Sequence, residues 1–152
     1  MWKELARLNE ELVVAMQNHR DVCDGAIVDL PTIASLRWRI AGISRQRLDH
    51  LNNTVLPTAE ATATGEFARR LQALKESTPA YRQQISAFLA AWPTAAIPGD
   101  WAGYRSESLA ILAVIQRRLA DENVLMQLAA RRGSHAGDAR EAVASLRAEL
   151  WR

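Results

Sequence analysis

The stretch Thr32–Pro57, TIASLRWRIAGISRQRLDHLNNTVLP, decides the predicted fold because its apolar residues have the spacing of a long amphipathic helix. Residues three or four positions apart share one face of a helix. The residues on this face are Ile33, Leu36, Ile40 and Ile43, followed by Arg47 and Leu51. An arginine on a buried face is unusual, since a guanidinium removed from water needs partners. We therefore predict that this helix carries a buried cation.

A second stretch, Gln116–Ala130, repeats the local pattern of the first. Arg118 takes the place that Arg47 has in the first stretch, and Glu122 follows one turn later on the inward face. A buried ionised carboxylate is costly unless it is paired. We expect Glu122 to pair with Arg47, with Arg118 or with both. The alternative is that these long side chains extend to the surface of the protein.

Helical periodicity runs through most of the chain, and no segment alternates apolar and polar residues as a strand would. We predict four long helices, over about residues 2–22, 31–57, 65–92 and 101–132, and a short fifth helix after residue 137. Long helices joined by short loops are typical of an up-down-up-down four-helix bundle. The predicted fold is therefore an all-α bundle that forms one domain, residues 1–152, with the fifth helix lying across it.

Prolines, glycines and capping residues set the predicted helix boundaries. The second helix should end near Pro57, because the residue before a proline is pushed out of the helical region. Pro79 interrupts a continuous periodicity and predicts one kinked helix rather than two helices. Residues 93–100 should form a loop. The predicted N-caps are Thr64, Asp100 and Asp138. Asp138 should form a capping box with Glu141. The fourth helix should end at Gly133.

Composition excludes several classes of function. The net charge of +2 is small and the basic residues are dispersed, so we expect no nucleic-acid partner. The single cysteine, Cys23, excludes an internal disulfide. No apolar run reaches the roughly 18 residues of a transmembrane helix, and the N-terminus does not resemble a signal peptide. We therefore expect a cytoplasmic protein that does not bind membranes.

Catalytic motifs are missing from the sequence. It contains no glycine-rich phosphate loop, nucleophile elbow or metalloprotease motif, so we predict no catalytic residues, no cofactor and no enzyme activity. His19 and Cys23 stand four residues apart, a spacing that can activate a thiol but is more typical of packed side chains. Trp38, flanked by two arginines, is a candidate for a surface that binds a protein partner or a second copy of the chain.

Three stretches of the chain carry a resemblance to a known family. They are SLRWRIAGISRQRLDHLNNTVLPTA (residues 35–59), EFARRLQALKESTPAYRQQISAFLAAW (66–92) and WAGYRSESLAILAVIQRRLADENVLMQLAARR (101–132). In this order they resemble the second, third and fourth helices of the hemerythrin-like (HHE cation-binding) domain. In that family the second and fourth helices each carry a His-x-x-x-Glu motif that precedes a proline. The resemblance implies a four-helix bundle.

The resemblance also identifies positions at which the family holds metal ligands. The second-helix motif falls on Arg47 and Leu51, and the fourth-helix motif falls on Arg118 and Glu122, so only the last glutamate is kept. The histidines of the third helix have no counterpart, and His19 is a weak candidate for one in the first helix. The resemblance therefore implies a degenerate metal site, with no metal expected.

Three functional hypotheses follow from these residues. The leading one is a metal-free hemerythrin-like bundle with an interaction or regulatory role. The second is a non-haem iron-binding or oxygen- or redox-sensing protein with a reduced site formed by His19, His50 and Glu122. The third is a bundle whose former site has become an apolar or anion-binding pocket, in which Arg47 and Arg118 face a carboxylate or phosphate.

Overall fold

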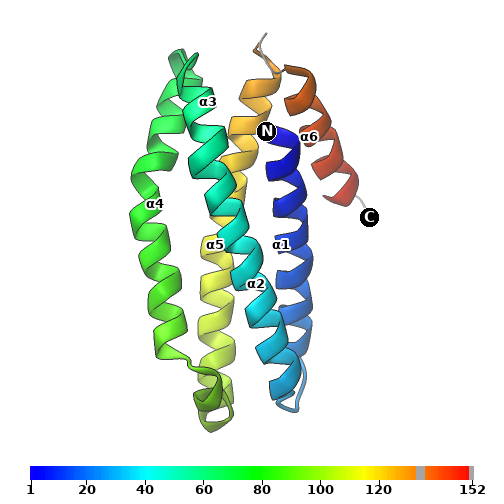
Figure 1. Ribbon diagram of the computed structural model, residues 1–152. Helices are drawn as coiled ribbons and strands as arrows, with labels where there is room; N and C mark the ends of the chain where they lie inside the picture. The colour runs from blue at the N-terminus through cyan, green and yellow to red at the C-terminus, as the bar shows by residue number, and fades with distance from the viewer. Residues whose placement is uncertain (133–135, 151–152) are drawn as a thin grey trace.

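The computed structural model describes residues 1–132 and 136–150, and its regular elements in these ranges are all helices. The long helices α1 (Trp2–Cys23), α2 (Leu30–His50), α4 (Gly65–Ala91) and α5 (Trp101–Ala130) run side by side (Figure 1). The shorter elements are η1 (Leu51–Val55), α3 (Leu56–Glu60), η2 (Thr94–Asp100) and α6 (Ala136–Leu150). Among the residues described, no helix has both the length and the apolar character needed to cross a bilayer.

The sequence predicted that the second helix ends near Pro57, and this prediction is wrong. Helix α2 widens into the π-helical turn η1, where the Leu56 N–H donates to the Leu51 carbonyl, and continues as α3 to Glu60. In a regular α-helix a proline ring collides with the carbonyl four residues earlier. The wider π turn changes the position of the carbonyls that precede Pro57, so the proline begins a new helical segment rather than ending the helix.

Helix α4 passes through Pro79 as one continuous helix of 27 residues, as its periodicity predicted. Thr64 is the N-cap residue in position, with extended backbone, but its side chain makes no capping hydrogen bond. The next residue, Gly65, has a φ of 59°, in the left-handed region that favours glycine. The start of α4 therefore depends on the backbone of Gly65 rather than on the predicted threonine cap.

The connection between α4 and α5 is more regular than the predicted loop. Residues 94–100 form the 3₁₀-helix η2, which places Ile97 in the core with no exposed surface. Asp100 caps α5 as predicted, since its carboxylate accepts from the Gly103 N–H at 2.9 Å. Helix α5 ends at Ala130, and the predicted role of Gly133 lies outside the described residues.

The C-terminal helix α6 contacts α1 and α5 and lies beside one end of them rather than across the other helices (Figure 1). Asp138, in its first turn, does not form the predicted capping box with Glu141. Its carboxylate instead accepts from the backbone N–H groups of Trp2, at 2.6 Å, and Lys3, at 3.3 Å. The first N–H groups of a helix lack partners within the helix and attract negative charge. Asp138 therefore caps α1, and Glu141 pairs with the Lys3 side chain.

The core consists of three apolar clusters that follow one another along the helices. The first lies where α6 packs and includes Trp2, Leu5, Leu51, Phe67 and Met126. The second includes Leu12, Met16, Ile43, Tyr81 and Leu112. The third lies next to η2 and includes Cys23, Ile33, Trp92, Ile97 and Tyr104.

Candidate functional site

A buried ion pair joins α2 to α5 in the interior. Arg47 donates from a terminal guanidinium nitrogen to Glu122 Oε2 at 2.5 Å, and neither side chain has exposed surface. Arg118, 3% exposed, places Nε at 3.4 Å from the same carboxylate oxygen. The prediction that Glu122 pairs with Arg47, with Arg118 or with both is therefore confirmed in its last form, and the alternative that these side chains extend to the surface is wrong.

Arg118 is also held by oxygen atoms of α4. One terminal nitrogen donates to the Leu74 carbonyl and to Ser77 Oγ, each at 3.0 Å, and the other donates to Thr78 Oγ1 at 2.8 Å. These neutral acceptors provide partners for both terminal nitrogens without balancing the charge, while the buried Nε has no hydrogen-bond partner among the described residues. The cluster of Arg47, Arg118 and Glu122, called the ion cluster below, thus contains two cations and one anion.

Tyr81 of α4 contacts both arginines of the ion cluster. Its hydroxyl accepts from Arg47 at 3.2 Å, and its ring centroid lies 5.3 Å from the central guanidinium carbon of Arg118. Burial raises the pKa of the Tyr81 hydroxyl above its ordinary value, against the lowering effect of Arg47. The phenol therefore stays neutral and acts as one more acceptor for the buried positive charge.

The two buried guanidinium groups differ in their electrostatic balance. Burial works against the charge of Arg47, but the attraction and hydrogen bonds of Glu122 and Tyr81 outweigh it and raise the pKa of Arg47. Burial outweighs the weaker attraction of Glu122 for Arg118 and lowers the pKa of Arg118. The shorter contact identifies Arg47 as the main partner of Glu122.

These residues do not form a metal site at the positions where the resembled family holds its metal ligands. A guanidinium has no lone pair to donate to a metal, so Arg47 and Arg118 cannot replace histidine ligands. Glu122 uses Oε2 for the arginines and Oε1 for the Asn9 side-chain amide, at 3.4 Å. Leu51, the fourth aligned position, is fully buried in the first apolar cluster. In the described part of the chain, no three His, Cys, Asp or Glu side chains gather in a way that could hold a metal ion.

The structure does not bring His19 and His50 to Glu122. His19 is ten residues beyond Asn9 on α1, which corresponds to about 15 Å along the helix axis. His50 lies towards the opposite end, where its Nε2 is 2.8 Å from the Met1 carbonyl oxygen. The reduced site suggested for these three residues is therefore not formed, since they occupy three separate levels of the molecule.

His19 belongs to a buried polar group at the η2 end of α1. Its Nε2 lies 2.7 Å from the Tyr104 hydroxyl, and its Nδ1 lies 3.7 Å from Cys23 Sγ. Burial, assisted by the charge of Arg37, lowers the pKa of His19 to about 4. Burial also raises the pKa of the Cys23 thiol, which disfavours the reactive thiolate. This geometry agrees with the interpretation that His19 and Cys23 are packed side chains rather than an activated thiol and its base.

The lowered pKa of His19 predicts a loss of stability in mild acid. The unfolded chain binds the proton near pH 6.5 and the folded protein only near pH 4, so stability falls as the pH drops between these values. Between pH 7 and pH 5 we expect this histidine to account for a loss of about 2 kcal/mol in the free energy of unfolding. Urea unfolding of the wild type and of His19→Gln at both pH values measures it. Equal losses in the two proteins would show that His19 does not cause the effect.

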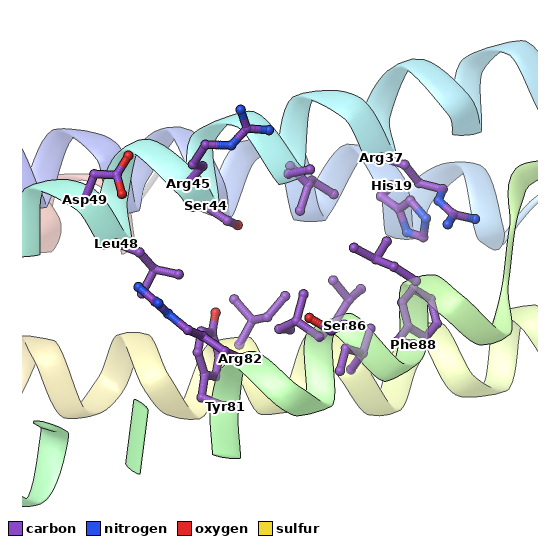
Figure 2. Close-up of a pocket in the computed structure, with 17 residues that line it drawn as sticks. His19, Arg37, Ser44, Arg45, Leu48, Asp49, Tyr81, Arg82, Ser86 and Phe88 are labelled. Carbon is purple, nitrogen blue, oxygen red and sulfur yellow. The ribbon is translucent and has the colours of Figure 1, made fainter. Parts of the chain in front are cut away.

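An apolar cleft opens between α2 and α4, with α5 as its floor (Figure 2). Its volume is about 410 Å³, within the range of about 300–1,000 Å³ that is usual for small-molecule sites. Tyr81 lines the cleft and also touches the ion cluster, whereas Arg47 and Arg118 do not line it. The apolar lining residues are Ile40, Ala41, Leu48, Ile85, Phe88, Leu89, Ile111, Leu112 and Ile115.

The mouth of the cleft carries an excess of positive charge. Arg37 and Arg45 come from α2 and Arg82 from α4, whereas Asp49 is the one carboxylate among the described residues that line it (Figure 2). Arg45, Arg82 and Asp49 are exposed, but the terminal nitrogen Nη1 of Arg37 is buried and has no hydrogen-bond partner among the described residues. A buried donor without a partner is costly.

Sequence reasoning did not identify this cleft. Ile40 and Ile85 lie on the predicted inward faces of their helices and were expected in a closed core, yet both remain partly exposed. The α2 residues between Ile40 and Leu48 that face the opening include Ala41 and Ser44, whose small side chains leave the space unfilled. The combination of small residues on α2 with branched apolar residues on α4 was the only available signal.

The tryptophans differ widely in exposure. Trp38 is 80% exposed on the outer side of α2, whereas Trp2 is 2% exposed. A protein partner or second copy bound at Trp38 stays a prediction. Trp151 lies outside the described residues.

Comparison of the chain with protein-family models, with curated proteins and with solved structures finds no match.

Proposed function

We propose that this protein is a metal-free, hemerythrin-like binding bundle without catalytic activity, and that its ligand occupies the α2–α4 cleft. The observation that carries the proposal is the ion cluster, in which arginines stand where the resemblance places metal ligands. The one aligned carboxylate, Glu122, already has its partners within the protein. A further cation there would face two guanidinium groups in a region of low dielectric constant, where repulsion between like charges is strong.

The arrangement of the long helices supports the hemerythrin-like part of the proposal. Helix α1 contacts α2 and α5, and α4 contacts α5. These contacts are those expected for an up-down-up-down bundle in which α1, α2, α4 and α5 follow one another around a common core. The proposed bundle differs from a closed one at its α2–α4 wall, where the cleft lies.

The cleft is better evidence for a binding role than any cluster of reactive side chains is for catalysis. It joins an apolar lining to a few charged and hydroxyl groups at the mouth, the usual composition of a small-molecule site. The one thiol near a histidine, Cys23 at 3.7 Å from His19 Nδ1, is buried and does not line the cleft, and burial raises its pKa and so disfavours the thiolate that a nucleophile needs. The geometry therefore favours binding over chemistry.

Metal analysis tests the metal-free part of the proposal. Untagged protein is purified, incubated anaerobically with Fe(II), desalted and analysed for iron, beside an identical sample of Glu122→Ala. We expect far less than one equivalent of iron in both proteins and no charge-transfer absorption in the near-ultraviolet. Near-stoichiometric iron in the wild type that disappears in Glu122→Ala would overturn the proposal and favour the iron-binding alternative.

A further inference from the structure

We propose that the α2–α4 cleft binds a single-chain aliphatic carboxylate, with its hydrocarbon chain along the cleft and its carboxylate on Arg37. This inference rests on the proposed binding role of the cleft and adds the chemical class of the ligand. Three features carry it: the length and lining of the cleft, the charge at its mouth, and the unsatisfied donor of Arg37.

The shape of the cleft fits an extended apolar chain. Its lining on α2 runs from Arg37 to Asp49, which is twelve positions later and about 18 Å further along the helix axis. Between these ends the walls are mainly branched aliphatic side chains, including Ile40, Ile85 and Ile115. A flat or highly polar ligand would leave these side chains in contact with water, whereas a flexible alkyl chain would cover them.

The charge at the mouth selects an anion. Three arginines and one aspartate line the opening, so the local excess is positive at neutral pH. His19 adds nothing to this charge, because its pKa of about 4 keeps it neutral. The same excess disfavours a cationic amphiphile.

Arg37 is the arginine best placed to hold the carboxylate. Its guanidinium carbon lies 5.8 Å from the Tyr104 ring centroid, at the end of the cleft that His19 and Phe88 also line (Figure 2). Its buried Nη1 finds no acceptor among the described residues. Arg45, by contrast, is exposed to water one turn before Asp49. A carboxylate oxygen at Arg37 would satisfy the buried donor through a charge-assisted hydrogen bond.

Calorimetric titration at pH 7.5 with dodecanoate, dodecanol, dodecyltrimethylammonium and octanoate tests the proposal, with each amphiphile kept below its micelle concentration. We expect dodecanoate to bind more tightly than dodecanol and dodecyltrimethylammonium. Each methylene removed should weaken binding by about two- to fourfold, so octanoate, which has four fewer, should bind at least about tenfold more weakly than dodecanoate.

Two variants and a matched control locate the head group and the chain. Arg37→Met should weaken dodecanoate binding by about tenfold or more and change dodecanol binding less than twofold, because only the carboxylate needs the guanidinium. Arg45→Met, which removes the same charge from the exposed rim, should weaken dodecanoate less than threefold. Ala41→Phe should fill the cleft and abolish binding of both ligands, while circular dichroism verifies that the variant is folded.

The possible failures are distinguishable. If dodecanol binds as tightly as dodecanoate, the assigned ligand class is wrong. If Arg37→Met and Arg45→Met have equal effects, the assignment of the carboxylate to Arg37 is wrong. In both cases the binding role of the cleft stands. If dodecyltrimethylammonium binds best, the charge argument is wrong. If none of the amphiphiles binds, or if Ala41→Phe is folded and does not change their binding, both the inference and the proposed role of the cleft are wrong.

Discussion

Replacing Glu122 with leucine is expected to lower the free energy of unfolding by about 3–5 kcal/mol, because it leaves two buried guanidinium groups without a counter-charge. Among the described residues, Arg47 would keep only the Tyr81 hydroxyl as a hydrogen-bond partner. Arg118 would keep its three acceptors on α4, so we expect most of the loss to arise from Arg47. Urea unfolding followed by far-ultraviolet circular dichroism measures the change.

The double variant Arg47→Met, Glu122→Leu separates the loss of a contact from the presence of an uncompensated charge. A buried ion pair replaced by apolar side chains of similar volume is often neutral for stability or even stabilising. We therefore expect the double variant to recover most of the stability lost in Glu122→Leu. A double variant that is less stable than the single variant would show that the ion pair itself, rather than avoidance of an unpaired charge, stabilises the fold.

A surface ion pair provides the matched control. Glu66 lies 3.7 Å from Arg70 on α4, and both side chains are about half exposed. Glu66→Leu should change stability by less than about 1 kcal/mol, because water screens the pair. If Glu66→Leu and Glu122→Leu lowered the free energy of unfolding by similar amounts, burial would not explain the effect of Glu122→Leu.

The second large effect is expected at Trp2, where Trp2→Ala should cost about 3–5 kcal/mol of stability. First residues of a chain are commonly frayed unless they are tied down. Here the indole is 2% exposed and meets the Phe67 ring edge-to-face at a centroid distance of 6.3 Å, while Asp138 caps the backbone N–H. The substitution would leave a cavity where α1, α4 and α6 pack together, which the same unfolding measurement detects.

Trp38→Ala is the control for this substitution. Trp38 is 80% exposed, so removing its ring should change stability by less than about 0.5 kcal/mol. If Trp2→Ala were as mild as Trp38→Ala, the first turn of α1 would not contribute to the core in the way that its burial indicates.

Local sequence patterns were enough to predict the helical class and the positions of the long helices, and they left the pairing of the central charges as one of two alternatives. Ile33, Ile43, Arg47 and Leu51 recur at helical spacing, and all four are buried on one face of α2 and η1. Periodicity is a local property, so it can be read from neighbouring residues alone. The inward position of Glu122 followed in the same way, but only the packing of the helices showed that Glu122 and Arg47 are fully buried and paired rather than extended to the surface.

Tertiary structure decided what local patterns could not. Asp138 looked like the cap of its own helix, but a carboxylate binds whichever free N–H groups lie nearest in space, and those belong to the start of α1. Pro57 looked like a helix end until the π turn before it changed the backbone around it. The cleft depends on how far α2 and α4 stand apart, a distance set by the packing of all the helices and not by the residues of either one.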